Sequence, residues 1–505
     1  MRKPIRIIRP IRRQMRDKLN IMQSDWKALL RFLGIILMAE GGLMGLCVVP
    51  AVHFADGTLW RIAGCAAATL AVGGGLWWAY RGETEIKNRR MSYLLVSLLW
   101  LTLSTFATLP FLLTGSTTSY TVAWFEAMSG VTSCGATAFA DVGALPASVL
   151  LWRSMTQWFG GFGVVLLVLA LTPRLGINKY SLYTAEASGA DNTGKTSVRT
   201  TVTVRRTLGV YLTLTMVFII LLMLSGMQMW DAVNLTFTNI SSGGFSPYSD
   251  SIASLTHTQQ YILAAQMLLS GVNFSLLFLL ITFRWRQIRH KVDQVSFYLI
   301  ICALSSAFVV LGLHYRSGYG WSDAVRQGTI QTLSALTTTG SVIGDYTQWW
   351  TPAVYLLLML GICGGMAGST SGGLKVMRVL ILLRNARGIL RNRLHPNAVD
   401  PVRLNGQPVS GHLINNVMVI FMVFGATLML GVMALMLGGV NATEAIGASV
   451  GCLTGYGPGL GASGGFGSYA HFSAPAMWVC SGLMLLGRLE CMTVIILFLP
   501  GFWRR

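Results

Sequence analysis

Long apolar stretches alternate with short basic connectors along almost the whole chain. Ten of these stretches have the length of roughly 20 residues that a helix needs to cross the hydrocarbon core of a membrane. The pattern therefore predicts membrane-spanning helices near residues 28–50, 60–80, 93–114, 148–172, 208–228, 258–283, 294–314, 351–383, 413–437 and 475–499.

Four shorter apolar stretches lie between these helices and are too short to cross. A membrane accepts such a re-entrant helix when protein or a water-filled cavity covers its free end. We expect short helices near 120–133, 230–241, 323–337 and 441–454. Each leads into a short loop that ends in glycine, and we name these the glycine loops 1 to 4. They read Thr132-Ser133-Cys134-Gly135, Ser241-Ser242-Gly243-Gly244, Thr337-Thr338-Thr339-Gly340 and Thr454-Gly455-Tyr456-Gly457.

The final glycines of the four loops are 109, 96 and 117 positions apart. This spacing predicts four repeats of helix, pore helix, loop and helix, near residues 90–190, 205–290, 292–400 and 410–505. A basic cytoplasmic arm (1–27) and two N-terminal transmembrane helices (28–85) precede the repeats. The predicted fold class is an all-α polytopic membrane protein with four pseudo-symmetric repeats around one central pore.

The glycine loops have the chemistry of a selectivity filter for a monovalent cation. A dehydrated ion needs oxygens in place of its water shell, and backbone carbonyls of an extended loop supply them. Such a backbone often requires positive φ, which glycine adopts at little cost. Ordinary glycine turns are the alternative, but four copies at matching places weigh against it. Carboxylates at Asp231, Asp323 and Glu444, near three helix starts, and at Glu126, early in the first helix, are helix caps, cation-gathering groups, or both.

A glycine-rich run, Gly361–Lys375, interrupts the long span that follows the third loop. Each glycine weakens a helix by about 1 kcal/mol relative to alanine, and an unwound segment at membrane depth must line a cavity or be buried in protein. We expect this to be the only broken span and to act as a movable gate; the alternative is a close-packed helix contact of small residues. The gate candidates are Gly364, Gly365, Gly368, Ser369, Thr370, Ser371, Gly372, Gly373 and Lys375.

Charged residues also interrupt the final span, at Arg488 and Glu490. A charge at mid-membrane costs roughly 2.5–3.5 kcal/mol on insertion scales, so it usually faces water or a partner. Arg488 therefore either faces the pore and opposes cations, or forms an ion pair with a carboxylate elsewhere. Lys375 either pairs with a pore-facing carboxylate or marks the cytoplasmic boundary.

Composition agrees with a membrane protein. The 505 residues are 53% hydrophobic and 11% charged, with a mean hydropathy of +0.58, whereas soluble domains carry about 25% charged residues. The net charge of +20 lies mostly in connectors on one side, which marks the cytoplasmic face, places both termini there and opens the glycine loops outward. We attribute the charge to topology and to attraction for anionic lipid, not to nucleic-acid binding. The eight cysteines show no CxxC pairing and are interpreted as small apolar core residues.

Several motifs together resemble the bacterial TrkH/TrkG potassium-uptake family, which belongs to a superfamily with KtrB and plant HKT transporters. The motifs are Phe125–Gly130, Leu151–Arg153 with Gln157–Gly161, Ala367–Lys375, Gly457–Gly459 and Gly487–Glu490 through Phe502–Arg504. The resemblance covers nearly the whole chain. It implies four repeats around one pore, K⁺ as the transported ion with no organic cofactor in the chain, and location in the bacterial inner membrane.

The same resemblance implies a homodimer with a cytosolic, nucleotide-binding, TrkA-like regulatory subunit. It maps the family's filter onto the four glycine loops, its gating loop onto Gly364–Gly373 and its pore arginine onto Arg488. All four final glycines match the potassium-preferring pattern of the superfamily. Cys134, Gly243 and the Gly455-Tyr456 pair depart from what is usual in the loops, which leaves details of selectivity open.

The leading hypothesis is potassium uptake through a gated pore, with or without proton or sodium symport. A sodium-conducting or weakly selective transporter of the same fold is the alternative. An alternating-access carrier would be expected to show broken helices in two inverted halves. An enzyme would need a clustered catalytic set, and the seven histidines are scattered with no HExxH or GxSxG motif.

Overall fold

The computed structural model of the protein describes residues 8–82, 89–171, 196–283, 292–395 and 401–503. Helices make up nearly all regular structure in these ranges. A small antiparallel hairpin, β1 (Arg403–Leu404) with β2 (Gln407–Pro408), and two short 3-10 turns, Tyr346–Gln348 and Gly461–Ser463, are the exceptions. The expected all-α fold is therefore confirmed.

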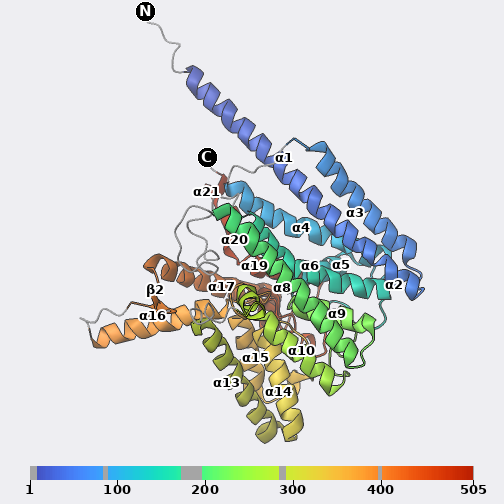
Figure 1. Ribbon diagram of the computed structural model, residues 1–505, viewed down its shortest axis with the longest axis vertical. Coiled ribbons are helices and arrows are strands. Elements are labelled where there is room, and N and C mark those ends of the chain that lie inside the picture. Colours follow the sequence, from blue (N-terminus) through green and yellow to red (C-terminus); the bar gives the residue numbers. More distant parts are fainter. Residues whose placement is uncertain (1–7, 83–88, 172–195, 284–291, 396–400, 504–505) are drawn as a thin grey trace, which may run out of the picture.

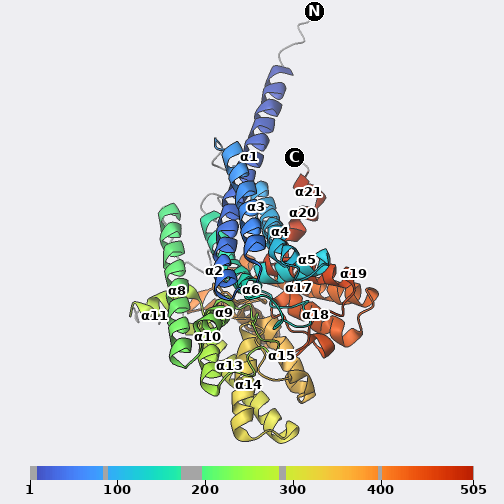
Figure 2. The same ribbon diagram turned by 90° about the vertical axis from the view of Figure 1, so that its right-hand side faces the viewer.

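The chain begins with a long helix, α1 (Ile8–Leu46), followed by α2 (Val48–His53) and α3 (Leu59–Ala79). Helices α1 and α3 lie side by side (Figure 1). Their backbones approach closely at Gly34 and Gly73, where a Cβ atom on either residue would lie 2.7 or 2.8 Å from the carbonyl oxygen of the other. Small residues allow this kind of contact between membrane helices. The N-terminal part of α1 projects from the body at the end where the C-terminal helix also lies (Figures 1 and 2).

The rest of the chain runs four times through a long helix, a short helix, a loop and a further helical segment. The elements are α4 (Arg89–Leu113), α5 (Tyr120–Val131) and α6 (Ala147–Leu171); α8 (Thr196–Leu224), α9 (Met229–Ile240), α10 (His257–Ser270) and α11 (Phe274–Ile281); α13 (Val292–Ser317), α14 (Trp321–Leu336), α15 (Thr351–Cys363) and α16 (Val376–Leu394); and α17 (Gly411–Leu437), α18 (Ala442–Thr454), α19 (Ala474–Arg488), α20 (Met492–Phe498) and α21 (Pro500–Trp503).

Six helices within the described ranges are long and apolar enough to cross a membrane, and eight if each of two bent pairs counts as one span. The bent pairs correct the expectation that only one span is broken. The stretch 258–283 bends by 110° between α10 and α11, and the stretch 475–499 bends by 112° between α19 and α20.

Local chemistry explains both bends. At the first, the Asn273 side chain caps α11 by accepting a hydrogen bond from the Ser275 N–H at 2.8 Å, which fixes a new helix start. At the second, Glu490 and Cys491 both have positive φ, 58° and 48°, a conformation that a continuous helix excludes.

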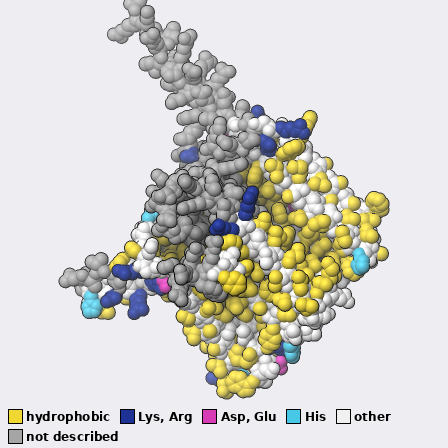
Figure 3. All heavy atoms as spheres, in the orientation of Figure 1, with side chains coloured by type: hydrophobic (Ala, Val, Ile, Leu, Met, Phe, Trp, Pro, Cys, Tyr) yellow, Lys and Arg dark blue, Asp and Glu magenta, His cyan; other side chains and the backbone are white. Residues whose placement is uncertain are grey.

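Hydrophobic side chains dominate the right and lower parts of the face shown in Figure 3, whereas Lys and Arg lie in its upper half and along α16 on the left. Buried apolar residues of α1, α3, α4, α5 and α6 form one core, and those of α13, α14, α15 and α18 form another. These cores hold the short helices α5, α9, α14 and α18 with their C-terminal ends at the glycine loops.

Candidate ion pathway

The four glycine loops meet in a closed ring. Each final glycine has φ between 73° and 90°, so a side chain there would be strained. Each final glycine also lies so close to the next loop that a Cβ atom on the glycine would collide with a carbonyl oxygen of that loop. The distance from such a Cβ atom to the oxygen would be 2.0 Å from Gly135 to Gly243, 2.0 Å from Gly244 to Thr339, 2.1 Å from Gly340 to Tyr456 and 2.5 Å from Gly457 to Cys134.

A second feature of the loop backbone is shared by all four copies. The residue two positions before each final glycine also has positive φ: Ser133, Ser242, Thr338 and Gly455. In the first three loops the next N–H donates back to the carbonyl five residues earlier, as Cys134 does to Ser129 at 2.9 Å. This is the Schellman ending of a helix. Because these N–H groups turn back toward the short helices, the carbonyl groups of the loops can point away from the helices.

The first hydroxyl of each loop makes the same hydrogen bond. It donates to the carbonyl four residues earlier in the short helix, at 2.7–2.8 Å in every loop. The hydroxyls belong to Thr132, Ser241, Thr337 and Thr454. The C-terminal ends of the four helices thus converge on the ring, and their dipoles place partial negative charge there, which favours a cation.

Side chains behind the ring hold it in place. Gln157 on α6 donates to the Gly243 carbonyl at 2.9 Å and accepts from the Phe245 N–H at 3.1 Å. Gln331 on α14 donates to the Tyr456 hydroxyl at 3.1 Å and accepts from the Ile343 N–H at 3.2 Å. Each glutamine therefore uses both ends of its amide on backbone or side-chain groups at or beside a loop.

A buried ion pair supports the first two loops. Arg153 donates to Glu126 at 2.7 Å, and both side chains are almost fully buried. Arg153 also donates to the Ser246 carbonyl and lies 4.0 Å from the centroid of the Phe245 ring, while Glu126 accepts from the Ala138 N–H. Glu126 was expected early in its helix, and it lies instead in the second half of α5. Asp231, Asp323 and Glu444 do lie in the first turns of their helices.

Two cavities flank the ring. One cavity, named the outer cavity after the orientation that the sequence predicts, has a volume of about 110 Å³. It is lined by all four final glycines, together with hydroxyl side chains such as Ser246 and Ser249. The inner one, of about 80 Å³, is lined by Thr132–Cys134, Thr454 and Gly455 of the loops and by Gly368–Gly373 of the glycine-rich run. A water needs about 10–15 Å³ on this measure, so each cavity has room for several waters or a hydrated ion.

The glycine-rich run lies directly beneath the ring. Helix α15 ends at Cys363 and α16 starts at Val376, so the run is unwound as expected. The Gly372 N–H donates to the Thr338 hydroxyl at 2.6 Å, and the Gly373 N–H donates to the Thr454 carbonyl at 2.9 Å. The Thr370 hydroxyl lies 2.9 Å from that of Ser242. The run is thereby tied to loops 2, 3 and 4.

The break between α10 and α11 holds the other side of this run. The Met366 N–H donates to the Gly271 carbonyl at 2.9 Å, and the Phe274 N–H donates to the Gly368 carbonyl at 3.0 Å. The Asn273 amide adds a bond to the Ala367 carbonyl at 2.6 Å. Two interrupted helices therefore satisfy each other's free backbone groups, which is what an unwound segment in a membrane requires.

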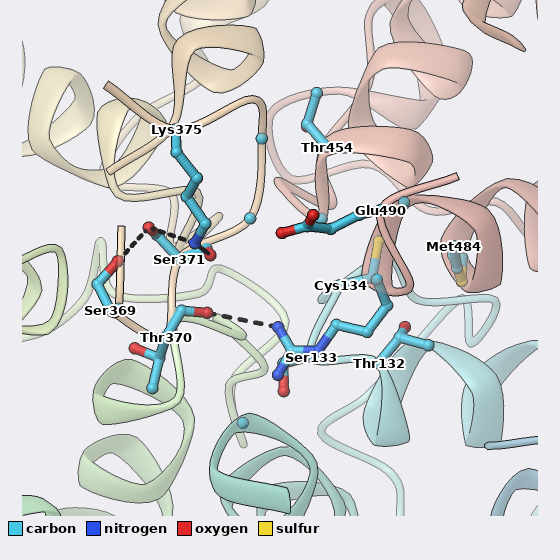
Figure 4. A pocket seen from close by; sticks show the side chains of 17 residues that line it. Thr132, Ser133, Cys134, Ser369, Thr370, Ser371, Lys375, Thr454, Met484 and Glu490 are labelled. Atoms are coloured by element: carbon cyan, nitrogen blue, oxygen red, sulfur yellow. Dashed lines mark hydrogen bonds between the residues drawn. The ribbon is translucent and has the colours of Figure 1, made fainter. Parts of the chain in front are cut away.

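The charged candidates line the same inner cavity. Arg488 donates to the Gly160 carbonyl at 3.0 Å and to the Thr370 carbonyl at 3.4 Å. Figure 4 shows Lys375 and Ser369 pointing toward Ser371. Lys375 bonds to the Ser371 carbonyl, and the Ser369 hydroxyl bonds to the Ser371 hydroxyl. Sequence reasoning missed a further pair: Arg378, at the start of α16, donates to Glu490 at 2.8 Å. Their separation of 112 positions left no local signal.

The fold and this site define a class: a multi-pass helical membrane protein with a ring of glycine loops between two cavities. The chain matches the TrkH family, described as cation transport protein, over residues 60–504, and it belongs to that family. It is 32% identical to the Trk system potassium uptake protein TrkH of Salmonella typhimurium over 95% of this chain and 99% of that one. The family transports ions and is not a family of enzymes.

Two further comparisons agree. The Trk system potassium uptake protein TrkG of Escherichia coli K12 is 29% identical over 86% of this chain and 89% of its own. The crystal structure of the potassium transporter TrkH from Vibrio parahaemolyticus superimposes with a TM-score of 0.86 at 28% identity, covering 95% of this chain and all of that chain. The resemblance noted from motifs is confirmed.

Proposed function

We propose that this protein takes up K⁺ across the bacterial inner membrane through the ring of glycine loops. The single observation that carries the proposal is the closed order of contacts, in which each final glycine touches a carbonyl of the next loop. Backbone oxygens held at one centre are what a stripped alkali ion needs. The relatives named as potassium uptake proteins make K⁺ the favoured ion. The sixteen loop residues would then form its binding sites.

The second part of the proposal concerns the glycine-rich run. Gly364–Gly373 is the gate, since it is bonded to three loops from below and closes the inner cavity against them. Several of its glycines have positive φ. A loop held mainly by individual hydrogen bonds can move away from its bonded position at a modest cost in free energy. Lys375 would anchor the end of the gate, and Arg488 would place a positive charge in the cation path.

The third part concerns organisation. We propose the division into a basic arm (1–27), two N-terminal helices (28–85) and repeats at 90–190, 205–290, 292–400 and 410–505. Both termini face the cytoplasm, because the basic connectors lie on that side. The names of the relatives speak of a Trk system, and we propose a homodimer that works with a TrkA-like nucleotide-binding subunit in the cytosol.

The test is rescue of a bacterium that lacks its own potassium uptake, on medium low in K⁺. The wild-type chain should restore growth and ⁸⁶Rb⁺ uptake, whereas Gly340→Ser should not, because its side chain would collide with the Tyr456 carbonyl. Gly439→Ser is the matched control: this glycine has φ 88° but nothing within 4 Å of a Cβ. Failure of well-expressed wild type to rescue would refute the proposal, and rescue of a sodium-uptake defect instead would point to the sodium-conducting alternative.

A further inference from the structure

Gly243 differs from the other residues at the third position of the glycine loops. In each of the other three loops, the side chain at this position makes a polar contact that fixes the residue. The contacts join Cys134 Sγ to the Gly451 carbonyl at 3.5 Å, Thr339 Oγ1 to Thr337 Oγ1 at 2.7 Å, and Tyr456 Oη to Gln331 Nε2 at 3.1 Å. Gly243 has no side chain, so loop 2 must be held at this position by another residue.

The Gln157 side chain occupies the space that a side chain on Gly243 would need. A Cβ atom on Gly243 would lie 2.4 Å from Cδ, 2.5 Å from Oε1 and 2.8 Å from Nε2 of Gln157. The φ angle of Gly243 is not in the left-handed region, so the backbone conformation does not require glycine there. The Gln157 amide is the reason for glycine at this position, and it takes the place of a loop side chain.

The amide of Gln157 bonds to both sides of the final glycine of loop 2. Its Nε2 donates to the Gly243 carbonyl at 2.9 Å, and its Oε1 accepts from the Phe245 N–H at 3.1 Å. Because a carbonyl only accepts and a backbone N–H only donates, these partners fix the orientation of the amide. The Gly243 carbonyl also faces Gly135 of loop 1. The amide therefore sets the direction of a carbonyl that belongs to the ring.

Gln157 is itself held in place between loops 1 and 2. It is fully buried, and its backbone carbonyl accepts from the Ser133 hydroxyl of loop 1 at 3.2 Å. One turn further along α6, a Cβ atom on Gly161 would lie 2.5 Å from Cβ of Ser241 in loop 2. Because the helix lies against both loops and the amide is bonded at both ends, the Gly243 carbonyl has little freedom to shift.

We propose that Gln157 is a positioning residue for ion selectivity, which acts through the Gly243 carbonyl. The choice of a filter between K⁺ and Na⁺ depends on the spacing of its carbonyls and on the strength of their dipoles. The hydrogen bond from Nε2 opposes the inward shift of this carbonyl that the smaller Na⁺ would need, and it uses one of the two lone pairs of the oxygen. Both effects favour the larger ion. This inference rests on the proposed conduction of K⁺ through the ring.

The test replaces Gln157 with methionine, which keeps the length of the side chain and removes both hydrogen bonds. The full chain is placed in proteoliposomes, and ⁸⁶Rb⁺ uptake is measured against rising external Na⁺, with ²²Na⁺ uptake measured separately. Gln157→Met should still take up ⁸⁶Rb⁺ when Na⁺ is absent. Its preference for Rb⁺ over Na⁺ should fall by roughly 10–100-fold, the usual effect on affinity of losing an outer partner of a metal ligand.

Gln266→Met is the matched control. Gln266 is also fully buried, and its Nε2 donates to the Thr236 carbonyl at 3.0 Å, but Thr236 belongs to helix α9 and not to a glycine loop. This variant should keep the selectivity of wild type. An unchanged preference for Rb⁺ in Gln157→Met would overturn the proposal. An equal loss of preference in both variants would also overturn it, because the effect would then come from a general loosening of the protein.

A second pair of variants tests the proposal if Gln157→Met does not fold. Gly243→Ala should displace the amide, because the added methyl group would collide with Gln157, and both uptake and selectivity should fall. Gly243→Ala/Gln157→Ala removes the collision and should recover ⁸⁶Rb⁺ uptake without the preference over Na⁺. Wild-type selectivity in the double variant would show that the amide is not needed. Absence of ⁸⁶Rb⁺ uptake by well-incorporated wild type would instead refute the transport proposal, and this inference with it.

Discussion

The four glycine loops share one hydroxyl bond and two positions of positive φ, whereas the chain that follows them takes three different forms. Every loop repeats the same hydroxyl bond and the same two positive φ angles. After them, α6 continues as one helix, α10 and α19 bend sharply into α11 and α20, and α15 is separated from α16 by an unwound run. This difference fits the proposed function, because a ring that binds an ion is expected to receive equal contributions from the four loops, whereas a gate needs one element that differs. The outer half is uniform and the inner half is not.

The uniform half is tested by alanine at each final glycine. Gly135→Ala and Gly244→Ala should each abolish selective ⁸⁶Rb⁺ uptake to a similar degree, because each Cβ would lie 2.0 Å from a neighbouring carbonyl oxygen, on top of about 1–3 kcal/mol of backbone strain. Gly115→Ala carries the same strain at φ 82° without a neighbour within 4 Å, and should keep uptake. If either Gly135→Ala or Gly244→Ala kept normal ion selectivity, the four loops would not be equivalent.

The differing half is tested at Thr370, whose hydroxyl lies 2.9 Å from both the Ser242 hydroxyl and the Ile240 carbonyl. Thr370→Val keeps the shape of the side chain and removes these hydrogen bonds, which lowers the stability of the proposed closed position of the run by about 1–2 kcal/mol. That corresponds to a rise of roughly 5–30-fold in the open population. Uptake without the regulatory subunit should increase accordingly.

Thr427→Val is the control for that substitution, since the Thr427 hydroxyl donates to the Val423 carbonyl four residues earlier in the same helix, α17. Unchanged uptake in Thr370→Val, with a normal dependence on the regulator, would show that the glycine-rich run does not gate the pathway from this position.

The recurring loops could be predicted from the sequence, whereas the segments that follow them could be predicted only in part. The loops were predicted because four local patterns recur, and glycine marks a turn. The positive φ of Ser133, Ser242 and Thr338 was not predicted, since serine and threonine rarely adopt it. The bend at Gly271–Asn273 was missed because one glycine and one asparagine are common within helices.

Pairing across the chain lies beyond such reasoning altogether. Glu126 was recognised, but its partner Arg153 was known only as part of a motif, and neither sequence distance nor residue type shows that Arg378 meets Glu490. These contacts depend on how the helices pack, so only the three-dimensional structure reveals them.

Arg488 lies where the two halves meet, and its charge gives the smallest of the expected effects. At an effective dielectric constant of about 20, like charges 5–10 Å apart repel by about 2–3 kcal/mol, and water in the inner cavity reduces this further. Arg488→Gln should therefore raise ⁸⁶Rb⁺ uptake severalfold, with the gain shrinking at high ionic strength. Arg488→Lys keeps the charge and should stay near wild type. An equal gain in uptake in both variants would assign the effect to the hydrogen bonds with Gly160 and Thr370. Unchanged or lower uptake in Arg488→Gln would favour a structural ion pair over a charge in the cation path.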